Sequence, residues 1–355
     1  MTTHPALRQL SVDHVRFHVA DASAAAERVK RSYGLEVYAL GEAGTDAQEE
    51  SVAVGAGSIR LVMTQALVDD HPATPYTSAH GDGVADIAMR TPDARAAYAA
   101  AVDRGARPVS PPSEHEGIVT ATVAGFGDVV HTFVERGSGV DDQSLPGLST
   151  VRSTGGEKGS TGLLEVDHFA VCLEAGQLEP TVRFYIDALG FEDIFAEHIV
   201  VGDQAMNSKV VQSISGEVTL TLIEPDQRRE PGQIDGFLKN HAGAGVQHIA
   251  FSTDDIVATV GALRGRGTEF LPTPETYYTQ LSQRLELSRH SVDELRRLDL
   301  LVDEDHDGQL FQIFARSTHP KRTFFFEVIE RLGATTFGSG NIKALYEAVE
   351  QERSL

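Results

Sequence analysis

Three side chains of metal-ligand type occur in the second part of the sequence. They are His168, His248 and Glu327, which lie on three separate predicted strands and are 80 and 79 residues apart. No local motif joins them, so the fold must bring them together. Two neutral imidazoles and one carboxylate suit Fe(II), because they leave coordination positions for a substrate and O2. The remaining positive charge of such a metal would attract an anionic chelator.

Each of these residues also has a purely structural explanation. His248 lies within Gly243–Phe251, whose alternation predicts a half-buried strand, and a hydrogen-bonded core histidine is common there. Glu327 stands in a strand that is otherwise strongly apolar. A buried carboxylate without a partner is costly, so a metal or an arginine must lie nearby. Arg331 and Arg316 are the arginines that could serve.

The sequence contains an internal repeat. Residues 166–173 match residues 12–19 at an offset of 154, and residues 243–251 match residues 81–89 at an offset of 162. The strand and helix patterns around these matches follow the order βαβββ four times. We therefore predict an α+β fold of paired βαβββ modules that form two open β-barrel-like domains.

The two halves differ at the metal-ligand positions. In the order given above, the counterparts in the first half are His14, Asp86 and Thr132. Only the second half has a ligand type at all three positions. We interpret this as a duplication in which one half kept its chemistry, and the alternative is that strand positions drift freely in a duplicated fold.

Further elements are expected around these strands. In the first half they are a strand over 12–20, a helix capped by Asp21 and Ser23 that ends near Gly34, and a helix over 92–103 that starts at Pro92. In the second half they are helices over 178–189 and 232–240, short insertions at 275–281 and 291–300, a turn over 303–308 and an amphipathic helix over 341–350. The turn lacks the features of a calcium loop.

The polar, glycine-rich segment 137–162 predicts a connection between two domains. We expect a structural N-terminal domain over 1–150. The catalytic domain, with the metal site and the C-terminal helix, is expected over 163–355.

Composition limits the partners. The net charge of −22 disfavours nucleic acid and anionic membrane surfaces. Cys172 is the one cysteine, which fits a reducing cytoplasm, and we expect neither a signal peptide nor a membrane span. The oligomeric state stays open, with a homodimer as one option.

Five motifs together resemble a known family. They are Val166–His168, Gly243–Ala250, Leu310–Phe314, Phe325–Arg331 and Phe337–Tyr346. The chain is similar to the vicinal oxygen chelate superfamily, and within it to the 4-hydroxyphenylpyruvate dioxygenases and their sister group, the 4-hydroxymandelate synthases. The resemblance covers nearly the whole chain. It implies Fe(II) on His168, His248 and Glu327, with a 2-oxo acid and O2 as substrates.

The resemblance also implies a substrate pocket. Its polar positions are Ser208, Gln233, Gln247 and Gln312, its aromatic wall is Phe314, Phe325 and Phe337, and positions Thr221, Ile223 and Ile342 depart from the dioxygenase pattern. Where the dioxygenases resemble Ile-Pro-Leu-Asn-Glu-Pro, this chain has Leu-Thr-Leu-Ile-Glu-Pro at 220–225, and Gly-Asn-Phe becomes Gly-Asn-Ile at 340–342. These departures are similar to the 4-hydroxymandelate synthases and imply the formation of 4-hydroxymandelate and CO2 from 4-hydroxyphenylpyruvate.

Three other functions stay open at this point. The first is ring hydroxylation to homogentisate. The second is extradiol cleavage of a catechol, which uses similar ligands on related modules. The third is a metal-free binding protein of the same fold.

Overall fold

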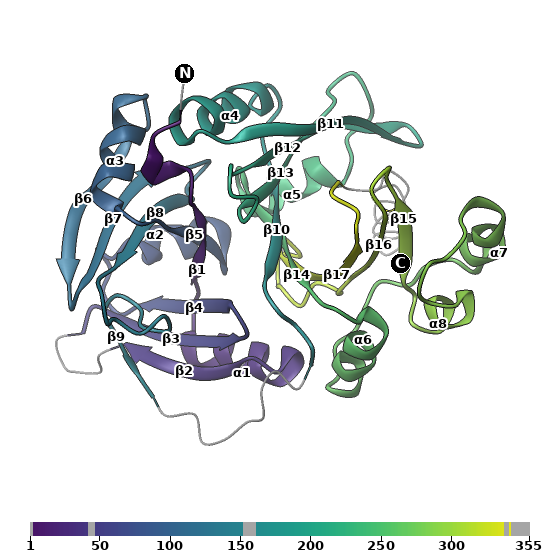
Figure 1. Cartoon of the computed structure of the whole chain (residues 1–355), viewed down its shortest axis with the longest axis horizontal. Coiled ribbons are helices and arrows are strands. Elements are labelled where there is room, and N and C mark those ends of the chain that lie inside the picture. The colour runs from purple at the N-terminus through teal and green to yellow at the C-terminus, as the bar shows by residue number, and fades with distance from the viewer. Residues whose placement is uncertain (1–2, 42–46, 152–160, 337–340, 342–355) are drawn as a thin grey trace.

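Two curled β-sheets lie side by side with helices packed around them (Figure 1). A computed structural model describes residues 3–41, 47–151, 161–336 and 341. The predicted α+β architecture of paired βαβββ modules is confirmed. Of the predicted C-terminal helix 341–350, only Asn341 falls within the described residues. The domain limits 1–150 and 163–355 stay a prediction.

The first sheet is built from the first half of the chain. Its strands, in spatial order, are β6 (Pro108–His115), β7 (Ile118–Ala124), β8 (Val130–Arg136), β5 (Gly83–Arg90), β1 (Ser11–His18), β4 (Ile59–Ala66), β3 (Glu49–Ala56), β2 (Glu36–Gly41) and β9 (Leu148–Thr150). Helices α1 (Ala22–Tyr33), α2 (Ala73–His80) and α3 (Ala94–Asp103) and a 3-10 turn (Pro5–Leu7) accompany it.

Within the described residues, the second sheet has the corresponding strands in the same order, listed here from the opposite edge, and lacks a ninth. It runs β11 (Glu192–Val201), β12 (Gln204–Gln212), β13 (Thr219–Pro225), β10 (Val166–Cys172), β14 (Gly245–Ser252), β17 (Phe325–Leu332), β16 (Gln309–Phe314) and β15 (Leu301–Glu304). Its helices are α4 (Leu178–Phe184), a π-helix (Tyr185–Leu189), α5 (Gln233–His241), α6 (Ile256–Gly265), α7 (Glu275–Arg284) and α8 (Val292–Arg297). In Figure 1, α7 and α8 stand outside β15.

Strand register confirms the internal alignment. In the first sheet His14 pairs with Ala88, and in the second His168 pairs with Ala250. The next parallel pairs also correspond, because Asp86 faces Val130 where His248 faces Phe325. The offsets of 154 and 162 residues therefore describe equivalent places in space.

Aspartates start the helices of the repeat. Asp21, Asp93 and Asp255 each accept a hydrogen bond from a backbone N–H in the first turn, of Ala24, Ala96 and Ala258 respectively. Such N-caps satisfy amide groups that the helix leaves unpaired. Because Asp93 is the cap, α3 begins at Ala94, so the predicted start at Pro92 was wrong.

Other local predictions also need correction. Ser23 lies inside α1 and donates to Glu50, so Asp21 alone caps the helix. The predicted turn over 303–308 is shorter, since β15 extends through Glu304. The predicted insertions 275–281 and 291–300 form α7 and α8, which pack on each other. None of the described helices combines the length and apolarity needed to cross a bilayer.

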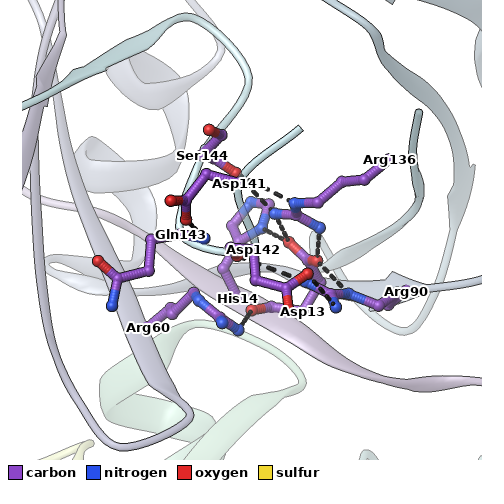
Figure 2. Close-up of polar contacts among 9 residues, drawn as sticks. All are labelled: Asp13, His14, Arg60, Arg90, Arg136, Asp141, Asp142, Gln143 and Ser144. Atoms are coloured by element: carbon purple, nitrogen blue, oxygen red, sulfur yellow. Dashed lines mark hydrogen bonds and ion pairs between the residues drawn. The ribbon is translucent and has the colours of Figure 1, made fainter. Parts of the chain in front are cut away.

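A buried ion-pair cluster, the first-half clamp, ties β1 to β8 in the first sheet. Asp13 is fully buried and accepts hydrogen bonds from His14 and Arg136, with Arg90 as a further partner (Figure 2). Arg136 also donates to the carbonyl of Ser144 at 2.7 Å. Burial opposes ionisation of Asp13, yet His14 and Arg136 hold the pKa of its carboxyl well below the usual value of 3.8.

Asp13→Asn should destabilise the protein by about 3 kcal/mol at neutral pH, because it leaves a buried guanidinium without its anion. The folded-state pKa of Asp13 is lowered, so its stabilisation is present above about pH 4 and is lost as the pH falls further. Urea unfolding at several pH values should show the wild type and the variant converging in acid. Asp142→Asn, at the exposed partner of Arg90, is the matched control and should change little.

Candidate metal centre

Three neighbouring strands position the metal-ligand types. β10, β14 and β17 are adjacent in the second sheet, where Ala250 pairs with His168 on one side and with Glu327 on the other. His248 precedes Ala250 by two residues and therefore points to the same face. Strand alternation and register thus place the three side chains at one point.

The three side chains meet in a buried place, which we call the triad site. Nε2 of His168 and Nε2 of His248 lie 3.4 and 3.1 Å from Oε2 of Glu327. The three residues are 2%, 6% and 1% exposed, and their ligand atoms all lie within 4.8 Å of one another. This spacing allows one ion to contact all three.

The donor set at the triad site fits a cation. Nδ1 of His168 lies 2.7 Å from a carboxylate oxygen of Asp167, which can only accept, so Nδ1 carries the proton. Nε2 of the neutral ring then presents a lone pair toward Glu327. Oε2 of Glu327, which faces Nε2 of both imidazoles, has no hydrogen-bond partner within the described chain. A metal ion satisfies these facing lone pairs.

Charges at the triad site are strongly coupled. Burial favours the neutral imidazole, but Glu327 and Asp167 raise the pKa of His168 to about 9. Burial also favours the neutral acid, but the two histidines lower the pKa of Glu327 to about 2. Burial lowers the pKa of His248. A proton on His168 thus compensates the carboxylate when no cation does, and metal binding displaces it.

An amide relay supports Glu327 from behind. Nε2 of Gln312 donates to Oε1 of Glu327 at 2.7 Å, and Oε1 of Gln312 accepts from Nδ2 of Asn341 at 2.8 Å. Gln312 is 3% exposed and Asn341 is fully buried. The relay leaves only Oε2 of Glu327 directed at the histidines. Arg331, proposed above as an alternative partner for Glu327, binds Asp167 at 2.8 and 2.9 Å.

Gln312→Met should lower metal affinity about 10- to 100-fold, because groups that orient a ligand contribute that much. Anaerobic titration with Co(II) as an optical probe measures the dissociation constant directly. Gln309→Met is the control, since Gln309 lies on the same strand but bonds Ser288 and Glu286 instead. Equal metal affinities in the two variants would contradict the relay's role.

The corresponding place in the first half is closed without an ion. Asp86 accepts hydrogen bonds from the backbone N–H and the hydroxyl of Thr132, at 3.0 and 2.6 Å. The counterparts of His248 and Glu327 thus satisfy each other. This contrast favours the second half as the place for a metal.

Most predicted pocket positions fall on the triad face of the second sheet. Phe325 stacks on His248 with ring centroids 4.9 Å apart, and Phe314 meets His248 edge-on at 5.9 Å. Ser208 pairs with Ile223, which pairs with Cys172 of β10, and both predicted residues are buried. The hydroxyl of Thr221 is buried without a hydrogen-bond partner in the described chain. Phe337 and Ile342 lie outside the described residues.

Two predicted glutamines lie apart from the other pocket positions. Gln247 directly precedes His248 in β14, and its Oε1 is 3.4 Å from Nδ1 of that residue. Gln233 starts α5 and its Nε2 has no hydrogen-bond partner within the described part of the chain. Both glutamines line a cavity of about 770 Å³ between the two halves. The lining described for that cavity does not include the triad.

Sequence reasoning missed the groups that hold the triad in place. Asp167, Arg331 and Asn341 are separated from their partners by up to 164 residues. One signal was available for the first pair, because Asp-His and Glu-Arg occur at equivalent places in both halves. A second cluster, Asp255, His290 and Glu330, is already satisfied, since Glu330 accepts from Arg289, His290 and the backbone of Ile256.

Known proteins resemble this chain over nearly its full length. The 4-hydroxyphenylpyruvate dioxygenase of Dictyostelium discoideum is 34% identical over 96% of this chain and 97% of its own. The chain belongs to the 4-hydroxyphenylpyruvate dioxygenase family. The dioxygenase of Yarrowia lipolytica is 30% identical over 96% and 92% of the two chains. The family model for the N-terminal part of hydroxyphenylpyruvate dioxygenase matches residues 46–145, and that of the glyoxalase/bleomycin resistance protein/dioxygenase superfamily matches residues 165–313.

Solved structures extend this family resemblance. A triple mutant of 4-hydroxymandelate synthase from Streptomyces coelicolor has a TM-score of 0.87 and 40% identity, and the match covers 97% of this chain and 98% of the other. A fusion of a xylose isomerase-like TIM barrel with 4-hydroxyphenylpyruvate dioxygenase has a TM-score of 0.76 and 25% identity, and the match covers 99% of this chain and 53% of that one. The predicted similarity to 4-hydroxymandelate synthase is confirmed as a resemblance of fold and sequence.

Proposed function

We propose that this chain is an Fe(II)-dependent oxygenase that converts 4-hydroxyphenylpyruvate and O2 to 4-hydroxymandelate and CO2. The observation that carries the proposal is the convergence of two imidazoles and one carboxylate, with an unsatisfied oxygen between them, in a member of this family. Fe(II) held by these residues would be chelated by the carboxylate and keto oxygens of the 2-oxo acid and would supply the chemistry for O2 activation. The two products together contain every atom of the two substrates.

The protein's own residues prepare this site. Asp167 fixes the tautomer of His168, Gln312 directs Glu327, and the ring of Phe325 holds His248 in place. Burial excludes bulk water from the reacting centre. These residues bind and orient, and the wall around them sets which carbon of the substrate is presented.

The benzylic product is favoured by an apolar wall. Ile223 is 4% exposed and packs in one cluster with Cys172, Met206 and Phe237. An isoleucine at this position offers no hydrogen bond to a phenol hydroxyl, so the ring is not held there as an amide would hold it. The 40% identity with a 4-hydroxymandelate synthase also supports this product. Homogentisate is the alternative, supported by the names of the curated relatives.

Product identification tests the proposal. Purified protein is supplied with Fe(II), air and 4-hydroxyphenylpyruvate, and the products are separated by chromatography because the two isomers share one mass. We expect 4-hydroxymandelate as the main product. Homogentisate as the main product would replace the synthase function with the dioxygenase function. Absence of turnover together with cleavage of catechols would remove both.

A further inference from the structure

The cavity between the two halves, here called the interlobe cavity, reaches the back of the triad site. We propose that it is the vestibule through which an aromatic 2-oxo acid anion approaches the metal centre. This inference rests on the proposed function. Its lining includes Gln247 and Phe325, which both contact His248. A ligand in the cavity is therefore separated from the triad by single side chains.

Both halves of the chain build the walls. Phe17 and Tyr33 come from the first half and meet Phe324 and Phe326 of the second, with ring centroids 5.2 and 4.8 Å apart. The volume of about 770 Å³ lies within the range of about 300–1,000 Å³ typical of small-molecule sites. These aromatic walls suit a phenyl ring. The first half, which does not have a metal-ligand type at all three triad positions, thus has a role in the approach.

Charge in the interlobe cavity is opposite to that of the chain. Arg28, Arg316 and Arg322 line it, against the carboxylates of Asp82 and Glu269. A guanidinium nitrogen of Arg28 lies 3.6 Å from a carboxylate oxygen of Asp82. No acidic side chain of the described residues lies within ion-pair distance of Arg322. The chain as a whole carries a net charge of −22. A positive opening in a negative surface concentrates an anionic substrate there.

The lining of the interlobe cavity also offers a buried hydrogen-bond donor. Gln233 is 7% exposed and lines the cavity, and its Nε2 has no hydrogen-bond partner within the residues described. A buried amide left unpaired costs free energy, which a carboxylate or keto oxygen of an arriving ligand would recover. The lining of the cavity therefore combines exposed arginines with a buried, unpaired amide.

The charge of the cavity can be measured without metal or turnover. Cys172 is buried, so Thr318→Cys, at an exposed residue of the cavity lining, adds one reactive thiol. The rate at which this thiol reacts with anionic dithionitrobenzoate is divided by its rate with neutral dithiodipyridine. The ratio reports the electrostatic potential at the thiol. Adding Arg28→Gln and Arg322→Gln should lower this ratio at least about threefold at low salt. The control Arg31→Gln, on α1 outside the lining, should leave the ratio unchanged. The proposal would be overturned if the ratio were the same with and without Arg28→Gln and Arg322→Gln.

Passage of substrate is tested by blocking the cavity. Thr318→Cys labelled with pyrene maleimide should lose at least about tenfold in kcat/KM for 4-hydroxyphenylpyruvate, while bound iron stays constant. The same label on Ser110→Cys, at an exposed position of β6, should have no effect. Unchanged kcat/KM in the labelled Thr318→Cys protein would overturn the vestibule.

A failure of the proposed function is distinguishable from a failure of the vestibule. If the wild type does not turn over 4-hydroxyphenylpyruvate, the function fails. The vestibule is then tested by whether this anion protects the thiol of Thr318→Cys from dithiodipyridine. Protection that disappears with Arg28→Gln and Arg322→Gln supports an anion-binding vestibule, and absence of protection refutes it.

Discussion

Glu327→Gln is expected to lower metal affinity at least about 100-fold and to abolish oxygenase turnover. An amide lacks the charge that offsets a divalent ion, and its nitrogen cannot coordinate as the carboxylate does. The carboxylate is 1% exposed, and one of its oxygens has no hydrogen-bond partner in the described chain and faces the two histidines. Anaerobic Co(II) titration measures the loss. Heating scans supply a second readout, since a ligand that binds only the folded state raises Tm.

The same chemical change in the first half is the control for Glu327→Gln. Asp86→Asn also converts a buried carboxylate to an amide, at the counterpart of His248. It can keep its hydrogen bonds with Thr132. We expect unchanged metal affinity and an unchanged metal-induced rise in Tm. If Asp86→Asn lost metal and Glu327→Gln did not, the wrong half would have been assigned.

Ile223→Asn is expected to raise the ratio of homogentisate to 4-hydroxymandelate at least about tenfold. A carboxamide there can bond the phenol hydroxyl and draw the ring toward β13, and a displacement of about an ångström changes which carbon can react. The amide enters an apolar cluster with Met206 and Phe237, so we expect about 1–3 kcal/mol of lost stability. Quantitative chromatography of both products measures the ratio.

Ile223→Val is the control for the polarity of this position. It keeps the site apolar and removes one methylene, so the product ratio should stay that of the wild type at a cost of about 1 kcal/mol. A product ratio that is unchanged in Ile223→Asn, with metal and turnover retained, would show that Ile223 does not direct the ring.

The triad could be predicted because strand alternation and the internal repeat, which are both periodic features of the sequence, fix where its side chains lie. Strand alternation fixes the face of each side chain, and the repeat supplies the relative position of strands far apart in sequence. His168, His248 and Glu327 needed no further knowledge of loops. Gln247 shows what alternation leaves open, because its side chain lines the cavity between the halves while its Oε1 lies 3.4 Å from Nδ1 of His248.

Features that depend on contacts between distant segments could not be predicted. The amide of Asn341 reaches Gln312 only because the chain returns to the sheet after β17. The interlobe cavity depends on how α1 packs against residues 315–326, which no pattern within either segment reveals. Helix α2 was missed because its hydrophobic residues lack a helical stripe, and tertiary contacts with β1, β4, β5 and α5 hold it instead.

The first-half clamp has an equivalent in the second half. Asp13 and Arg136 stand where Asp167 and Arg331 stand, and each arginine also holds a carbonyl of the segment that follows its strand, that of Ser144 or Thr336. Catalytic capacity could therefore be lost from one copy through changes at two side chains while the scaffold stayed intact. The reverse change would also need few substitutions, because the first half still has the ion pair that supports the ligand strands. The first half is therefore a starting point for acquiring new chemistry.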